Sequence, residues 1–238
     1  DLIMFGEMLL SWYDPLANTN EQNAISEPIP GKTTDLLAQL SQKFGVYLCC
    51  GLSEKVDNQY FNAQVLIDPQ GDLQAVHRKR NLKPAEREAG YTAGLKPVTI
   101  TEIKGIRTGM LICADAADPS TMLEMMRSKL ELVLLSLADD RDENWFMAKA
   151  NARMYDAWIV SANRIGQENH YWNGHTIISD PLGRLRATLI EQEGYMAHTL
   201  RLTQDRSSFQ RMVRNIYVKT PLLFHILKNW RVLRSYYE

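Results

Sequence analysis

The sequence predicts an α/β protein with two layers of sheet in the core and helices outside them. Continuous apolar runs such as residues 132–137 are typical of buried strands, and segments such as 145–155 have helical periodicity. Paired strand patterns also flank turn residues, as around Asp68-Pro69-Gln70-Gly71. The 238 residues suit one domain of this class, so we expect a single domain over residues 1–238.

The first expected element is a buried strand at residues 2–5, followed by an Asn-, Glu- and Pro-rich loop at 12–30. A helix is expected over 33–44, capped by Thr33 or Thr34. Later strands are expected at residues 46–51, 61–67, 73–78, 98–103, 106–112, 132–137, 158–163, 176–179, 185–189 and 196–200. The other expected elements are helices at 121–129 and 145–155 and a long loop at 81–97.

The composition is ordinary for a soluble globular protein, with 45% hydrophobic and 23% charged residues. A net charge of -1 gives no reason to expect nucleic-acid binding. No apolar run approaches the roughly 18 residues of a membrane-spanning helix. The three cysteines, Cys49, Cys50 and Cys113, are too few for a disulfide framework and favour a reducing compartment, so we expect a cytoplasmic protein.

Three residues whose side chains could take part in catalysis lie at the ends of strand-like runs. Cys113 ends the run 105–113, Lys79 ends 75–79, and Glu7 follows the first strand. A free thiol is mostly protonated at neutral pH and needs a base before it attacks a carbonyl or nitrile carbon. A desolvated carboxylate can be that base, and a lysine can stabilise the resulting oxyanion. These residues therefore predict one site of covalent catalysis.

The order of the flanking segments resembles the nitrilase, or carbon–nitrogen hydrolase, superfamily. The segments that carry the resemblance are Asp1-Leu-Ile-Met-Phe-Gly-Glu7, Gly31 to Gly51, Tyr60 to Leu82 with Lys79, Tyr91-Thr-Ala-Gly94, Gly109-Met-Leu-Ile-Cys113-Ala-Asp115, Ala162-Asn-Arg164 with Gly166, and Gly174 to Gly183. The resemblance implies an α-β-β-α sandwich that pairs into a homodimer or a larger homo-oligomer. It also implies thiol-dependent hydrolysis of a non-peptide carbon–nitrogen bond, without metal or organic cofactor.

The resemblance also implies a role for each site residue. Glu7 is the base, Cys113 the nucleophile, and Lys79 holds the oxyanion together with the backbone N–H of Ala114. The family often has a second glutamate, for which Glu88 fits best by its spacing to Tyr91, with Glu86 as the alternative. The implied substrate is a small or medium carboxamide, with a nitrile as the alternative.

Some features depart from the family pattern. Gly6 stands where proline is usual, and small residues at 114 and 116–117 replace the bulky or cationic side chains common after the nucleophile. Carbamoyl-amino-acid hydrolysis is therefore less favoured. The family's first strand and helix are absent before Glu7, which we interpret as truncation. An acyl-transferring or amide-forming enzyme, and a non-catalytic ligand-binding relative, remain as alternative functions.

Two further predictions concern aromatic residues and the C-terminal tail. Trp145 and Tyr171, with the neighbouring Trp172, either line a substrate pocket or pack in the core or an interface. Residues 209–238 form a basic pattern in which apolar residues recur at helical spacing. We expect this tail to pack across a subunit interface, and contact with a membrane surface is the less favoured alternative.

Overall fold

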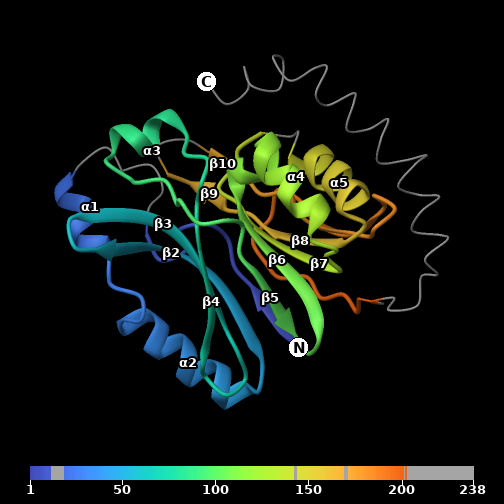
Figure 1. Cartoon of the computed structure of the whole chain (residues 1–238), viewed down its shortest axis with the longest axis horizontal. Coiled ribbons are helices and arrows are strands. Elements are labelled where there is room, and N and C mark those ends of the chain that lie inside the picture. Colours follow the sequence, from blue (N-terminus) through green and yellow to red (C-terminus); the bar gives the residue numbers. More distant parts are fainter. Residues whose placement is uncertain (12–18, 142–143, 169–170, 201, 203–238) are drawn as a thin grey trace.

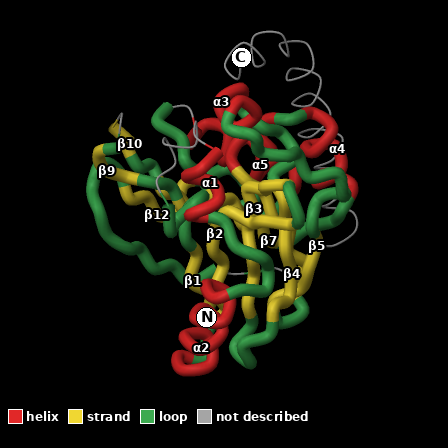
Figure 2. The backbone as a smooth tube through the Cα atoms, turned by 90° about the vertical axis from the view of Figure 1, so that its left-hand side faces the viewer, coloured by secondary structure: helices red, strands yellow, loops and turns green. Residues whose placement is uncertain are grey.

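The chain folds into two facing sheets with helices on their outer sides, as the sequence predicts (Figure 1). The structure is a computed structural model, and it describes residues 1–11, 19–141, 144–168, 171–200 and 202. The basic tail predicted at residues 209–238 lies outside the described residues. Figure 2 shows the strands of both sheets between α2 at the bottom and α3 at the top.

The first sheet has four strands in the order β1-β2-β3-β4. Its strands are β1 (Leu2–Met4), β2 (Tyr47–Val56), β3 (Gln59–Ile67) and β4 (Leu73–Arg78). The pair β1–β2 is parallel and the other two pairs are antiparallel. Helix α2 (Lys32–Phe44) packs on the outer face, where Leu37 meets alternate side chains of β2 and β3 such as Cys50 and Val65.

The second sheet has six strands in the order β12-β11-β8-β7-β6-β5. Its strands are β5 (Ile100–Ile103), β6 (Ile106–Ile112), β7 (Leu132–Ser136), β8 (Trp158–Ala162), β11 (Thr176–Ser179) and β12 (Leu185–Leu189). The central strands β6, β7 and β8 are parallel, so their carboxyl ends lie at one edge of the sheet. Loops that leave this edge are positioned to build a site.

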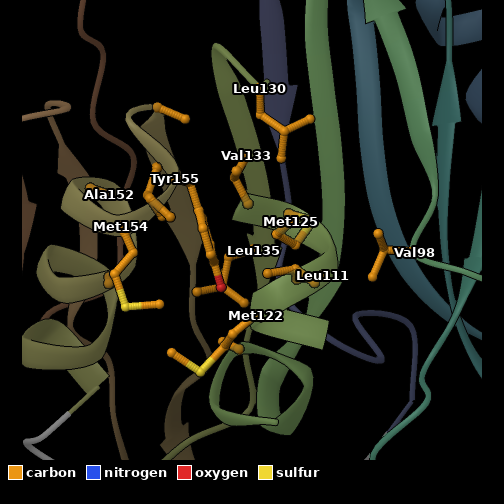
Figure 3. Close-up of a cluster of buried hydrophobic side chains, with 14 of the residues drawn as sticks. Val98, Leu111, Met122, Met125, Leu130, Val133, Leu135, Ala152, Met154 and Tyr155 are labelled. Atoms are coloured by element: carbon orange, nitrogen blue, oxygen red, sulfur yellow. The ribbon is translucent and has the colours of Figure 1, made fainter. Parts of the chain in front are cut away.

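Helices α4 (Pro119–Arg127) and α5 (Asn144–Tyr155) cover the outer face of the six-stranded sheet. Figure 3 shows part of this layer, in which Met122, Leu135 and Tyr155 pack together. A separate cluster fills the space between the two sheets and includes Cys49 and Leu66 from one sheet and Met110 and Leu134 from the other. The apolar faces of the sheets therefore hold them together.

Several predicted boundaries are wrong. The region 12–30 contains helix α1 (Thr19–Ile25), and the region 81–97 contains helix α3 (Pro84–Glu88). Gly31 is the N-cap of α2, in place of Thr33 or Thr34. Thr34 lies in the first turn of α2, and its side-chain hydroxyl accepts the backbone N–H of Gly31.

The predicted strands also differ from the observed ones: one observed pair was not predicted, and one predicted strand does not form. The strands β2 and β3 meet in a tight hairpin at residues 57–58, because β2 continues well past Gly51. A short antiparallel pair, β9 (Ile165–Gln167) and β10 (Tyr171–Asn173), was not predicted. Residues 196–200 do not form a strand. Met196 and Leu200 instead pack as an extended segment against the cluster between the sheets.

Gly51 allows the backbone around Gly6 and Glu7 to approach β2. A Cβ at position 51 would lie 2.6 Å from the Gly6 carbonyl oxygen and 2.8 Å from both Glu7 Cα and Met8 N. We expect Gly51→Ala to destabilise the fold by about 1–3 kcal/mol, the usual cost of overpacking, and to reduce activity by displacing Glu7. Thermal unfolding and turnover measure the two effects.

Gly6→Ala is the matched control for this substitution. A Cβ at position 6 would come no nearer than 3.2 Å, to the Leu137 carbonyl oxygen, so the expected destabilisation is smaller. Equal stability and activity of Gly51→Ala and Gly6→Ala would contradict the proposed close contact at Gly51.

Candidate active site

The two sheets bring Glu7, Lys79 and Cys113 to a common position between them. Glu7 follows β1, and Lys79 follows β4 of the same sheet. Cys113 follows β6 of the other sheet. All three side chains are buried, and Lys79 and Glu7 have no exposed surface. The predicted strand ends bring Glu7 and Lys79 into contact at 2.8 Å, and Ala138 contacts both Glu7 and Cys113.

Cys113 begins a short 3-10 turn, η2 (Cys113–Ala117), at the end of β6. Its backbone has a φ of +42°, a left-handed conformation that is uncommon for a residue with a Cβ. Such conformations cost free energy and concentrate at functional sites. The thiol lies 3.9 Å from the carbonyl oxygen of Ala138, in the loop after β7.

The Glu7 carboxylate accepts hydrogen bonds from three groups. Its Oε1 accepts from Lys79 Nζ at 2.8 Å and from Asn62 Nδ2 at 2.6 Å. Its Oε2 accepts from the backbone N–H of Ala138 at 2.8 Å. Because the Ala138 carbonyl also lies near the thiol, one peptide segment contacts both the carboxylate and the nucleophile.

The second carboxylate of the site belongs to Glu86 and not to Glu88. Glu86 lies in α3, is buried, and places Oε2 2.8 Å from Lys79 Nζ. Its Oε1 accepts from Asn62 Nδ2 at 2.8 Å, and its Oε2 also accepts from the Lys83 N–H at 2.8 Å. Glu88 is exposed, so the preference for Glu88 is wrong and its alternative, Glu86, is the residue next to Lys79.

Burial dominates the protonation of this site. It raises the pKa of the Cys113 thiol to about 12, and the negative charge of Glu7 adds to this rise, whereas Lys79 and Lys83 oppose it. Burial also raises the pKa of Glu7, against the lowering effect of the Lys79 ammonium. The Glu86 carboxylate raises it further. A thiol with a raised pKa beside a carboxylate with a raised pKa is suited to proton transfer between them.

The other predicted site residues have mixed outcomes. Ala114 lies in the turn directly after Cys113 and is buried, and its carbonyl oxygen accepts a hydrogen bond from Asn81 Nδ2 at 3.1 Å. Tyr171, on β10, is half-exposed, whereas the adjacent Trp172 is buried in a cluster with Met8 and Ala138. Trp145 lies in α5, and its side chain is outside the described residues.

Sequence reasoning missed three residues that support the site. The side-chain amide of Asn62 donates to both Glu7 and Glu86. Its backbone carbonyl oxygen accepts the backbone N–H of Lys79 at 2.8 Å. The Asn163 side chain accepts the Asp139 N–H at 3.0 Å and donates to the Asp139 carbonyl at 2.7 Å, so it fixes the loop that contains Ala138. A polar residue inside the apolar run 61–67 was the available signal for Asn62.

Arg164 fixes the chain just after Glu7. Its guanidinium donates to the carbonyl oxygens of Glu7 at 3.1 Å, Met8 at 2.7 Å and Ser11 at 2.7 Å. Met8 has a φ of +50°, so these hydrogen bonds hold a left-handed residue next to the buried carboxylate. The Asn163-Arg164 pair therefore supports the site from both the Ala138 loop and the Glu7 loop.

Two further findings concern metal-binding groups and membrane-spanning helices in the described part of the chain. Within it, no group of three or more His, Cys, Asp and Glu side chains is arranged to hold a metal ion. Of its helices, none is both long enough and apolar enough to cross a membrane.

Comparisons with known proteins give relatives in sequence and neighbours in fold. An (R)-stereoselective amidase of Pseudomonas sp. is 27% identical over 190 residues, which cover 78% of this chain and 67% of the amidase. A CN-hydrolase superfamily protein of Xanthomonas campestris has a similar structure, with a TM-score of 0.75 at 20% identity, covering 94% of this chain and 84% of that one. An amidase of a Nesterenkonia species has a TM-score of 0.69 at 20% identity, covering 81% and 74% of the two chains.

The family comparison covers most of the sequence. The sequence model of the carbon-nitrogen hydrolase family matches residues 1–207, which include Glu7, Lys79, Glu86 and Cys113. This chain therefore belongs to the carbon–nitrogen hydrolase family.

Proposed function

We propose that this protein is an amidase that hydrolyses a small or medium carboxamide through a thioester on Cys113. The observation that carries the proposal is the buried ion pair between Glu7 and Lys79, 2.8 Å apart, which the Ala138 segment links to the thiol of Cys113. It supplies a base, a cation and a nucleophile in one place. In a Glu-to-Gln mutant of the Nesterenkonia amidase, the acetamide moiety of fluoroacetamide is added covalently at the active-site cysteine, which supports a nucleophilic role for Cys113.

The thiol of Cys113 needs a base in this mechanism. With a pKa of about 12, only about one molecule in 10⁵ would hold a free thiolate at pH 7. Glu7 takes the thiol proton as sulfur attacks the amide carbon, and the carbonyl oxygen becomes an oxyanion. Lys79 and the Ala114 N–H stabilise that oxyanion.

The tetrahedral intermediate then collapses by breaking the carbon–nitrogen bond. Glu7 gives its proton to the departing nitrogen, which leaves as ammonia or an amine, and the acyl group remains on sulfur as a thioester. Glu7 next takes a proton from water, whose oxygen attacks the thioester carbon. The carboxylic acid leaves and the proton returns to sulfur. Glu86 helps to keep the Lys79 ammonium in place throughout, since its Oε2 lies 2.8 Å from Nζ.

A panel of carboxamides and nitriles tests this proposal. We expect ammonia and carboxylic acid in equal amounts, and quenched reactions should contain protein heavier by one acyl group. Peptide mapping should place that group on Cys113. Cys49 and Cys50, which are also buried free thiols, are internal controls in the same digest.

Other outcomes would contradict the amidase proposal. An adduct that is released only after addition of an amine would identify an acyl-transferring or amide-forming enzyme, since water would then not resolve the thioester. Absence of adduct and product across the whole panel would favour a ligand-binding protein. An acyl group on Cys49 or Cys50 alone would reject Cys113 as the nucleophile.

A further inference from the structure

Asp115 is a buried carboxylate that the proposed mechanism does not use. It lies two residues after Cys113 in the turn η2 and has no exposed surface. Its Oδ1 accepts the backbone N–H groups of Arg80 at 3.0 Å and Asn81 at 2.8 Å. Its Oδ2 lies 3.0 Å from His77 Nε2 and accepts the Ile112 N–H at 3.3 Å.

Three of the four partners of Asp115 flank Lys79 on both sides. His77 precedes Lys79 by two residues, and Arg80 and Asn81 follow it directly. A second bond runs between the same two segments, from Asn81 Nδ2 to the Ala114 carbonyl at 3.1 Å. The turn that carries the nucleophile, in the six-stranded sheet, therefore holds the segment that carries Lys79, in the four-stranded sheet.

We propose that Asp115 is a positioning residue that fixes the Lys79 ammonium relative to the Cys113 thiol. This inference rests on the proposed amidase function. Hydrogen bonds to an ionised carboxylate are stronger than bonds between neutral groups, and these link backbone atoms one or two residues from Lys79. A misplacement of about 1 Å in an active site can lower a rate by about 10²-fold. Asp115 thus acts on oxyanion stabilisation through Lys79, without touching the substrate.

Asp115→Asn tests the proposal with little change in shape. The amide oxygen can still accept hydrogen bonds from one side, but the amide NH₂ then faces donors on the other and the charge is lost. We expect kcat to fall by about 10- to 100-fold, with a change in KM smaller than about threefold, because the ground-state complex does not contain the oxyanion. Alkylation of Cys113 by iodoacetamide should stay within about threefold of wild type, because that reaction forms no oxyanion.

Asp180→Asn is the matched control. Asp180 is a buried carboxylate that also accepts two backbone N–H groups, those of Leu182 at 2.9 Å and Arg184 at 3.0 Å. It follows Ser179, which pairs with Ile159 near the start of β8, so it lies at the edge opposite the site. Asp180→Asn should affect melting temperature like Asp115→Asn but leave kcat near the wild-type value.

A milder variant covers the case in which Asp115→Asn does not fold. Asn81→Ala removes only the side-chain bond to the Ala114 carbonyl, at a partly exposed residue. It should lower kcat by a few fold to tenfold with KM and alkylation unchanged. Unchanged kcat in both folded variants, or an equal loss in Asp180→Asn, would overturn the positioning role and leave the amidase proposal intact. A wild-type protein that forms no thioester with any amide would overturn both.

Discussion

Replacing Cys113 with alanine is expected to reduce amide hydrolysis on the order of 10⁴-fold or more, to near the uncatalysed rate. The alanine removes the sulfur atom that forms the proposed thioester, and it keeps the Cβ, so the conformational cost of a φ of +42° is unchanged. The fold should remain intact, since the side chain loses a single buried atom. Ammonia release and intact mass together measure the loss of turnover and of acyl adduct.

Cys50→Ala is the control for the Cys113 substitution. Cys50 is a free thiol without exposed surface on β2, so its replacement has the same chemical change in a different part of the core. We expect the Cys50→Ala protein to hydrolyse amides at nearly the wild-type rate. Retention of about one tenth or more of the activity by Cys113→Ala would show that another group is the nucleophile.

Glu7→Gln is expected to lower kcat by about 10²- to 10⁴-fold, the usual contribution of a general base. Both oxygens of Glu7 accept hydrogen bonds, from Lys79 and Asn62 on one side and from the Ala138 N–H on the other. A glutamine amide therefore turns its NH₂ toward a donor in either orientation. This mismatch should also cost about 1–3 kcal/mol of stability, which thermal unfolding can measure.

The pH profile gives a second measure of the role of Glu7. The carboxylate is the form that accepts the thiol proton, so wild-type activity should rise as pH increases through the pKa of Glu7. Burial raises that pKa, so the rising limb should lie above the ordinary glutamate value of about 4.3. The residual activity of Glu7→Gln should lack this limb.

Glu88→Gln is the matched control, because Glu88 is an exposed carboxylate on α3. Its kinetics and pH profile should match those of the wild type. A rising limb that persists in Glu7→Gln would assign the titrating base to another residue.

The sequence was sufficient to predict the strand ends that carry the site. Cys113 follows an apolar run that forms the mostly buried strand β6, and Lys79 follows β4, the second strand of a hairpin pattern around Asp68-Pro69-Gln70-Gly71. The pattern alone did not show that Glu7 would meet Lys79 across β2 and β3. That contact depends on the strand order β1-β2-β3-β4, which only the structure shows, whereas the family resemblance implied just that the residues share one site.

The choice between Glu86 and Glu88 could not be made from spacing. The two residues lie in a short helix within a region predicted as loop, and residues two apart in a helix point to nearly opposite sides. Only one of them can therefore reach Lys79, and the helix phase decides which one. The Pro84 at the start of α3 was the signal for that helix, because proline is favoured in the first turn.

The supporting contacts were beyond sequence reasoning for a different reason. Asn163 and Arg164 act on carbonyl and N–H groups of Asp139 and Glu7, which belong to distant segments. Almost every residue has a backbone N–H and C=O, so the sequence of a segment does not show which of these groups a distant side chain will bind. The extended segment at 196–200 was mispredicted because apolar residues that pack on a core cluster show the same pattern as a paired strand.

The division of the site between the two sheets makes activity a direct report on how they are docked. Glu7 and Lys79 belong to the sheet of β1 and β4, whereas Cys113 and Ala138 follow strands of the other sheet. A partly folded chain in which each sheet has formed separately would retain its circular dichroism signal and yet have no working nucleophile. Turnover therefore measures complete tertiary assembly, where spectroscopic signals of secondary structure cannot.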